Sequence, residues 1–366
     1  MYQNRTYRRF LDKTAVLASA ILCLAACVKT EVVIEAEKVP VTFSTYSQKT
    51  LATKADTSFV APGGNFAVGA EIGVFGFYHD GATWAGETSA GTNIPDFMYH
   101  QKVVKQSDGS WTYSPIKYWP NESGASAAST DIDRLSFWGY YPYGATGLTL
   151  YKPGTTTAYD NNTSGLPKLT FTQQQDPSEM VDLMIATPLK DLYKNDSDGH
   201  GAVTGGEVNL VFKHALSLIV IELAEGTGAE LNSFSVTNLY SSGVLEDPST
   251  LAWTGVSNSF SVSETSTVVE GADIVGMLLI PQEIDASTTL SINYDIHFAS
   301  SDPDHPAPIV YSGNSGSALL RGIGGITEWE AGKRYVYRVS AGFERIEFES
   351  AVASDWSTGV DNIPVN

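Results

Sequence analysis

Basic residues are scarce in this 366-residue sequence, which has 22 lysines and arginines against 41 aspartates and glutamates and a formal net charge of -19. A surface this acidic repels phosphate groups, so the charge excludes nucleic-acid binding. Long hydrophobic runs are also missing: after the N-terminal segment, no stretch approaches the roughly 20 apolar residues that a membrane-spanning helix needs. Cysteine is limited to Cys23 and Cys27. Aromatic side chains, in contrast, are plentiful, with 18 Tyr, 15 Phe and 7 Trp, and this balance is typical of an exported β protein.

The first 26 residues have the layout of a signal peptide. A basic start that contains Arg5, Arg8, Arg9 and Lys13 precedes a short apolar run, Ala15–Ala26. The run ends in Leu24-Ala25-Ala26 directly before Cys27, which resembles a bacterial lipobox. This resemblance implies that residues 1–26 are a lipoprotein signal peptide and that Cys27 becomes the lipidated, palmitate-bearing N-terminus in the outer membrane. A conventional signal peptide with a cysteine at this position by chance is the alternative.

The rest of the chain predicts an all-β protein, because short β-type runs recur between clusters of Gly, Asn, Asp and Pro. The first run is Val39–Tyr46, and Lys49–Gly64 follows it as a linker or loop. Roughly 340 mature residues exceed what one hydrophobic core usually organises, so two domains are expected. The segment Val208–Leu223 changes from alternating to near-continuous apolarity, which predicts a strand pair or a strand passing between domains. The boundary is placed near His214, which is expected to be a structural histidine.

Motifs of enzyme chemistry are absent: the sequence has no nucleophile elbow, zinc-protease pair, Walker loop or dinucleotide fingerprint. Neighbouring carboxylates do occur, and turn capping explains them better than catalysis, at Asp131, Asp133, Asp176, Glu179 and Asp182. We therefore expect neither an enzyme nor a cofactor.

One segment has the spacing of a calcium loop. Asp196, Asp198 and Glu207 stand at ligand positions 1, 3 and 12, with Gly201 at position 6. Position 5 is a histidine and Glu207 begins a strand rather than a helix, so an exposed loop is favoured over a metal site.

An ordered series of phrases resembles the fimbrillin family of Bacteroidetes, the lipoprotein subunits of surface pili and their relatives. The phrases are IGVFGFY (72–78), WTYSPIKYWP (111–120), LSFWGYYPY (135–143), VDLMIA (181–186), VNLVFKHALSLIVIEL (208–223), MLLIPQ (277–282) and AGKRYVYRV (331–339). The resemblance implies two tandem transthyretin-like β-sandwich domains after the lipoprotein signal peptide. Their expected limits are 65–213 and 214–366, preceded by an N-terminal segment, 27–64, that holds a removable strand and a linker.

The resemblance also implies an assembly mechanism. A trypsin-like protease removes the first strand, here Val39–Tyr46, and a terminal strand of a neighbouring subunit fills the vacated groove by β-augmentation. Family members often present Arg at the cut, whereas this chain has Lys54, and its first arginine after the signal peptide is Arg134. This departure, together with the short polar C-terminus after Trp356, favours a tip or anchor subunit over a stalk subunit.

Two hypotheses of different classes remain at this point. In the first, the chain is a structural or adhesive fimbrial subunit, and its partners are other fimbrial subunits and a host or bacterial surface ligand. In the second, it is a non-polymerising surface lipoprotein that binds a glycan or host ligand. Exposed aromatics would support the second, although core packing is the favoured interpretation for Trp84, Trp111, Trp119, Trp138 and the run Tyr140–Tyr143.

Overall fold

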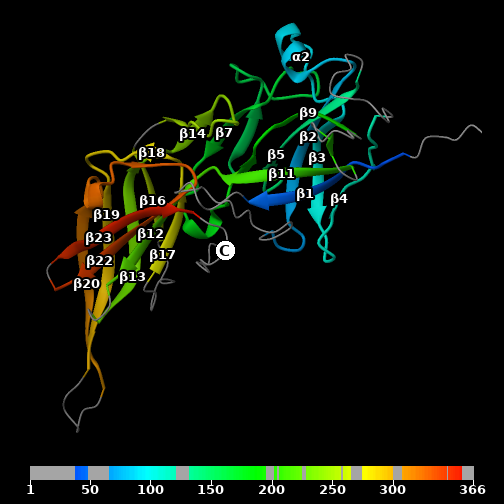
Figure 1. Ribbon diagram of the computed structural model, residues 1–366. Coiled ribbons are helices and arrows are strands. Elements are labelled where there is room, and N and C mark those ends of the chain that lie inside the picture. Colours follow the sequence, from blue (N-terminus) through cyan, green and yellow to red (C-terminus); the bar gives the residue numbers. More distant parts are fainter. Residues whose placement is uncertain are drawn as a thin grey trace, which may run out of the picture. The chain divides into compact units, whose positions relative to one another are not determined.

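A computed structural model describes residues 38–47, 66–120, 132–194, 202–203, 206–224, 228–256, 259–264, 274–299, 307–343 and 345–356 (Figure 1). Residues 39–366 belong to one compact unit, which contains every helix and strand named below. Among the described residues, no helix is long and apolar enough to cross a membrane. The expectation of an all-β protein is confirmed, because strands form nearly all of the regular structure.

The first part of the unit is built on a nine-stranded sheet, in which the first described strand lies beside a much later one. Its order is β10-β9-β5-β2-β3-β4-β1-β11-β8, and β8 also pairs with β5, so seven of the strands close into a barrel-like arrangement. The strands are β1 (Thr42–Ser47), β2 (Glu71–His79), β3 (Met98–Lys105), β4 (Trp111–Thr112), β5 (Arg134–Tyr141), β8 (Met184–Ala186), β9 (Leu189–Lys194), β10 (Ala202–Val203) and β11 (Glu207–His214).

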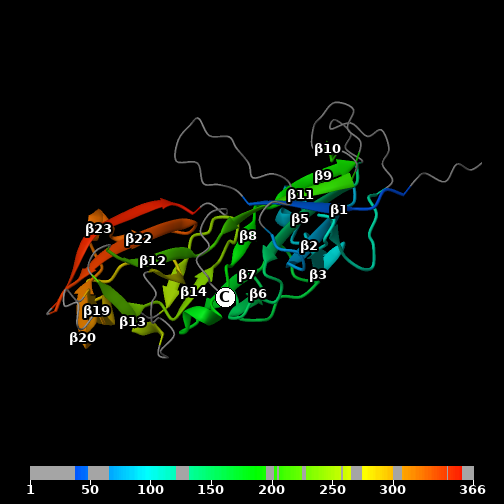
Figure 2. The same cartoon turned by 90° about the horizontal axis from the view of Figure 1, so that it is seen from below.

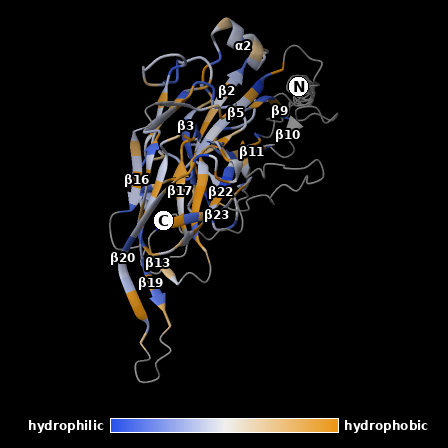
Figure 3. Cartoon of the chain, turned by 90° about the vertical axis from the view of Figure 1, so that its left-hand side faces the viewer, coloured by the Kyte–Doolittle hydropathy of each residue, from blue (hydrophilic) through white to orange (hydrophobic). Residues whose placement is uncertain are grey.

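Two four-stranded sheets make up the C-terminal part of the unit (Figures 1, 2 and 3). One has the order β17-β12-β22-β23 and the other β16-β13-β19-β20, so β20 and β23 are edge strands. Their bounds are β12 (Ser217–Leu223), β13 (Ala229–Leu239), β16 (Phe260–Glu264), β17 (Ile274–Leu279), β19 (Thr289–Phe298), β20 (Ile309–Leu319), β22 (Lys333–Ala341) and β23 (Ile346–Asp355). The near-continuous apolarity of 208–223 belongs to two strands, β11 and β12, and β12 is buried on both faces between β17 and β22.

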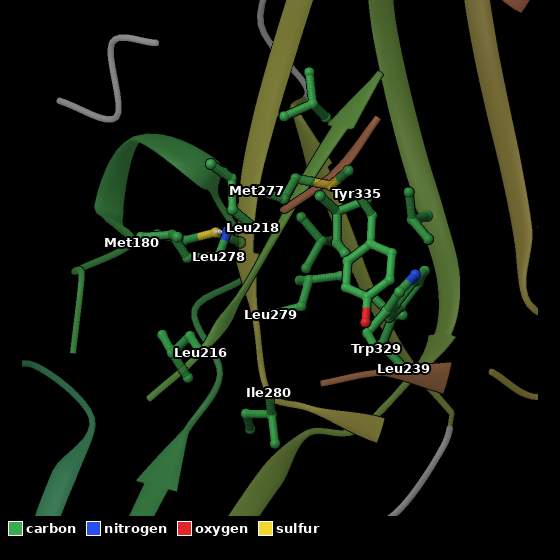
Figure 4. Close-up of a cluster of buried hydrophobic side chains, with 14 of the residues drawn as sticks. Met180, Leu216, Leu218, Leu239, Met277, Leu278, Leu279, Ile280, Trp329 and Tyr335 are labelled. Carbon is green, nitrogen blue, oxygen red and sulfur yellow. Dashed lines mark hydrogen bonds between the residues drawn. The ribbon is translucent and has the colours of Figure 1, made fainter. Parts of the chain in front are cut away.

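A third four-stranded sheet joins strands from both sides of the expected domain boundary. Its order is β15-β14-β7-β6, and its strands are β6 (Leu148–Tyr151), β7 (Lys168–Thr172), β14 (Ser242–Leu245) and β15 (Thr254–Val256). Beside it, the side chain of Gln173 donates to the carbonyl of Leu278 at 2.8 Å and accepts from the amide of Ile280 at 3.0 Å. The Leu278 amide also points at the sulfur of Met180, 3.1 Å away (Figure 4). One continuous core therefore includes residues from Phe75 to Trp356.

The remaining elements are short. They are β18 (Gln282–Glu283), which pairs with β21 (Glu328–Trp329), the helix α2 (Trp84–Ala90), and 3-10 turns at Pro177–Glu179 and Ile323–Gly325. Thr83 caps α2 by accepting a hydrogen bond from the Gly86 amide, and Gly91 ends the helix in the left-handed region.

Candidate functional site

The candidate site is the position of β1 between β11 and β4, which we call the β1 slot. Along its whole length β1 pairs in parallel with β11, from Thr42 opposite Glu207 to Ser47 opposite Phe212. On the other side its ladder with β4 consists of a single pair, Phe43 opposite Trp111. The strand β1 thus depends on a strand about 165 residues later for most of its backbone partners.

Backbone hydrogen bonds fasten the residues just before β1 to the segment after β4. The Val41 amide donates to the Lys117 carbonyl, and the Trp119 amide donates to the Val39 carbonyl, both at 2.9 Å. The Tyr113 hydroxyl donates to the Val41 carbonyl at 2.7 Å, and burial raises the pKa of this phenol. The hydrogen bond of this hydroxyl to Val41 fixes one end of the slot.

Three alternate side chains of this segment face the interior: Val41, Phe43 and Thr45 are 1%, 3% and 0% exposed. The Phe43 ring packs edge-on against Tyr113 and Phe137, with centroid separations of 5.6 and 5.7 Å. Thr42, between them in the alternation, is exposed. Withdrawal of β1 would return this apolar surface to water, at a cost of roughly 1.5–3 kcal/mol for a side chain the size of Phe.

Hydrogen bonding in the slot is incomplete, whereas its apolar side chains are fully packed. Ser44 is hydrogen-bonded to the Asn209 side chain on β11. The Thr45 hydroxyl and the Trp111 indole N–H are buried, and neither has a hydrogen-bond partner within the part of the chain that the structure describes. A buried polar atom without a partner costs about 1–3 kcal/mol, so the resident strand does not satisfy every group of the slot.

Close backbone contact at one end of the slot requires a glycine. Gly206, directly before β11, has φ of +82°, and a Cβ atom there would come within 2.7 Å of the Pro40 carbonyl oxygen. The Trp119 indole donates to the Gly206 carbonyl at 2.9 Å. The start of β1, the start of β11 and the segment after β4 therefore meet at one point.

The far end of β11 lies against the last described residue of the chain. The ring of His214 stacks on that of Trp356, with centroids 3.7 Å apart and planes 13° apart. Its Nδ1 lies 2.8 Å from a carboxylate oxygen of Asp182, and the Trp356 amide donates to the Gly332 carbonyl. His214 is 3% exposed and Trp356 is 8% exposed, so both are buried, as expected for a structural histidine, although the His214 Nε2 has no hydrogen-bond partner among the described residues.

Most residues predicted to carry lipid, proteolysis or calcium lie outside the described residues. This is true of the signal peptide, Cys27, Lys54, Asp196 and Asp198, which remain predictions. Glu207 is described and begins β11 as an exposed residue. No group of three or more His, Cys, Asp or Glu suited to a metal occurs among the described residues.

The structure also places the aromatic residues considered for glycan binding. Trp84, Trp111, Trp119 and Trp138 are all 9% exposed or less, which confirms core packing for them.

Arg134 is also 9% exposed, and its guanidinium donates to the carbonyls of Ala82 and Ile132. The Arg134 side chain is therefore poorly accessible to a protease that cuts only after arginine.

The sequence indicated the strand of this site but not the contacts that hold the strand in place. No pattern in the sequence indicated the roles of Tyr113 and Trp119, which lie in the phrase WTYSPIKYWP, or of Gly206, which lies in a loop. The contact of Trp356 with His214 joins residues 142 positions apart, so no local pattern could indicate it.

Comparisons with known proteins give a family and a fold. The model of a family described as fimbrillin-like matches residues 53–356. A solved structure of a candidate cell adhesion protein from Bacteroides uniformis has 17% identity and a TM-score of 0.53, covering 87% of this chain and 98% of its own. A second one, from Bacteroides ovatus, has 16% identity and a TM-score of 0.52, covering 88% of this chain and 99% of its own. No curated protein matches the sequence. At these identities the structural likeness shows the fold alone.

Proposed function

Since the chain belongs to the fimbrillin-like family, we propose that it is a subunit of a cell-surface fimbria, exported as a lipoprotein and assembled by β-strand complementation. Membership makes it a fimbrial or adhesion subunit, a structural protein rather than an enzyme. The observation that carries the assembly mechanism is the β1 slot, where one short strand lies between β11 and β4 and fills an apolar interior.

The slot suits strand exchange for two reasons. Loss of β1 would free the edge of β11 over six consecutive residue pairs, and an incoming strand can use the same main-chain groups. It would also uncover the positions of Val41, Phe43 and Thr45, whose alternation sets the register of a replacement. The Thr45 hydroxyl has no hydrogen-bond partner among the described residues, so a replacement strand without such an unsatisfied group would bind more favourably than the resident one.

The delivery steps rest on the sequence. In this proposal, residues 1–26 direct export, Cys27 carries the lipid that anchors the precursor in the outer membrane, and cleavage after Lys54 releases β1. Sandwich domains at 65–213 and 214–366 follow. The lysine in place of arginine favours a tip or anchor position over a stalk position.

Limited trypsin digestion of the native chain, followed by sequencing of the new N-terminus, tests the release of β1. We expect a first cut after Lys54 and then ladders of multimers on a gel. Lys49 also follows β1, so the matched control is Lys49→Gln/Lys54→Gln, which should stay uncut in this segment and monomeric. A cut after Lys54 that yields only monomers would refute assembly by strand exchange.

The anchor has its own test. Replacement of Cys27 by Ser should release the protein from the membrane fraction of cells that express it. Retention of the Cys27→Ser chain in that fraction would refute lipid anchoring and leave the slot argument untouched.

A further inference from the structure

The edge strand β20 is the feature of the C-terminal sheets that the proposed function leaves unused. Its 11 residues, Ile309–Leu319, pair with β19 on one side, and no described strand pairs with the other side. Figures 1 and 2 both show β20 at the periphery of its sheet. An open edge presents a row of unpaired N–H and C=O groups, which is a template for another strand.

Natural edge strands are normally protected, and β20 lacks two of the usual means, charged residues and proline. Between Ile309 and Leu319 there is no charged residue and no proline. The other long edge strand, β23, carries Glu347, Glu349 and Asp355, and the edge strand β16 has only five residues, of which Ser263 donates its amide to the Gln175 carbonyl. In a chain of net charge -19, β20 is a neutral stripe.

A bulge protects only one end of this edge. The register with β19 shifts between Tyr311 and Asn314, where Gly313 has φ of +81°, and Asp295 accepts hydrogen bonds from Ser312 and the Gly313 amide. From Asn314 to Leu319 the pairing is regular. Six consecutive residues thus form a flat, open edge.

The side chains along the flat segment are small or exposed. Ser315, Ser317 and Leu319 point away from the core, and Leu319 is 53% exposed. Beside them lies a shallow depression of about 400 Å³, and the one charged side chain that lines it is a cation, Arg345. The Glu347 carboxylate lies 2.6 Å from this guanidinium, so the two charges next to the depression balance each other.

At the N-terminal end of β20 the exposed side chains are apolar, and Figure 3 shows hydrophobic colouring there. Ile309, Val310 and Tyr311 are 53%, 44% and 48% exposed. The Tyr311 ring contacts those of Phe298 and Phe343, which are also partly exposed, with centroids 5.8 and 5.1 Å away. A strand docked on β20 could bury part of this surface as well as pair with the backbone.

We propose that β20 pairs in antiparallel fashion with β20 of a second copy of this chain, joining two four-stranded sheets into one continuous sheet. Two acidic copies repel each other least where both are neutral, which favours a second copy at this stripe. A two-fold axis through the pair makes the interface isologous, so each strand meets its own small residues. Pairing through β20 needs no removal of β1 and goes beyond the proposed strand exchange.

The two-fold axis restricts the register. Directly opposite residues of an antiparallel pair share a face, so the axis passes beside a residue rather than between two. An axis at Gly316 places Ser315 opposite Ser317 of the other copy, whereas an axis at Ser315 or Ser317 places that serine opposite itself. In each of these registers small, uncharged serines face each other, so neither bulk nor charge opposes the pairing.

Cysteine cross-linking of the uncut full chain tests the proposal. In a Cys23→Ser/Cys27→Ser background, Ser315→Cys, Ser317→Cys and an equal mixture of the two are oxidised mildly. Ser350→Cys, an exposed position on the acidic edge β23, is the matched control. We expect at least about fivefold more disulfide-linked dimer than in the control from one of the three β20 samples, since opposed Cα atoms lie about 4.5–5.5 Å apart.

A second variant separates pairing from random collision. Leu319→Lys, an exchange at an exposed position of the same edge, is added to whichever β20 sample cross-links and should lower its dimer yield to that of the control, because a lysine on the edge of each copy opposes strand pairing. Equal yields from the β20 and β23 cysteines, or a yield that ignores the lysine, would overturn the proposal. The trypsin experiment is independent of this one, because every sample here retains β1.

Discussion

At the scale of single residues, Phe43 is a buried side chain that attaches β1 to the interior. It is 3% exposed and packs against Tyr113 and Phe137. Phe43→Ala removes this packing and leaves a cavity, so we expect the free energy of unfolding to fall by about 3–5 kcal/mol. Urea denaturation followed by tryptophan fluorescence measures the loss.

The neighbouring position supplies the control. Thr42 lies on the same strand and is exposed, so Thr42→Ala should change the free energy of unfolding by about 0.5 kcal/mol or less. Equal effects of the two variants would show that β1 contributes backbone pairing alone.

Gly206 makes a second prediction at this scale. Gly206→Ala meets both an unfavourable φ and the Pro40 carbonyl oxygen, and we expect a loss of about 1–3 kcal/mol. Gly109→Ala is a matched control, because Gly109 has φ of +89° but nothing within 4 Å of a Cβ atom. The difference between the two variants in urea denaturation isolates the close approach of β1 to β11, and no difference would contradict it.

At the scale of elements, the slot should accept its own strand as a separate peptide. A chain that begins at Ala55 lacks β1, and a peptide with the sequence of residues 39–47 carries the side chains that fill the slot. We expect saturable binding by fluorescence anisotropy. The same peptide with Phe43→Glu should bind at least about tenfold more weakly, since a buried unpaired carboxylate is costly.

Strand positions were predictable where a local pattern sets them. The alternation in Val39–Tyr46 indicated β1, observed at Thr42–Ser47, and the apolar run after His214 indicated a strand buried on both faces, as β12 is. Which strands pair was not predictable. The parallel alignment of β1 with β11, the closure of β5 on β8 and the pairing of β14 with β7 all join distant segments, and tertiary packing rather than local propensity decides them.

The same limit applies to the site. Its strand could be recognised from the sequence, whereas the hydrogen bond of Tyr113 to Val41 and the stacking of Trp356 on His214 exist only in the folded chain. The open edge of β20 was also invisible, because its serines and glycines form no hydrophobic period and its status as an edge depends on sheet order.

At the scale of the whole molecule, buried tyrosines couple the stability of the unit to alkaline pH. Burial raises the pKa of Tyr113, Tyr140 and Tyr335 above the ordinary value of 10.0, and it raises that of Tyr337 to about 12. The unfolded chain releases these protons near pH 10, before the folded chain does. Their stabilising contribution is therefore complete below pH 10 and is lost as the pH rises toward 12.

Tyr337 allows this coupling to be tested at one position. Tyr337→Phe removes a group whose folded pKa lies about two units above its unfolded value, so the fall in unfolding free energy between pH 10 and 12 should flatten by roughly 1 kcal/mol per pH unit. The variant also removes the oxygen that accepts from the Trp329 indole, which lowers stability at every pH and leaves the slope as the informative quantity. Urea titrations at pH 10, 11 and 12 measure these slopes, and a parallel fall in the parent chain and Tyr337→Phe would show that this buried phenol does not govern the alkaline limit of the fold.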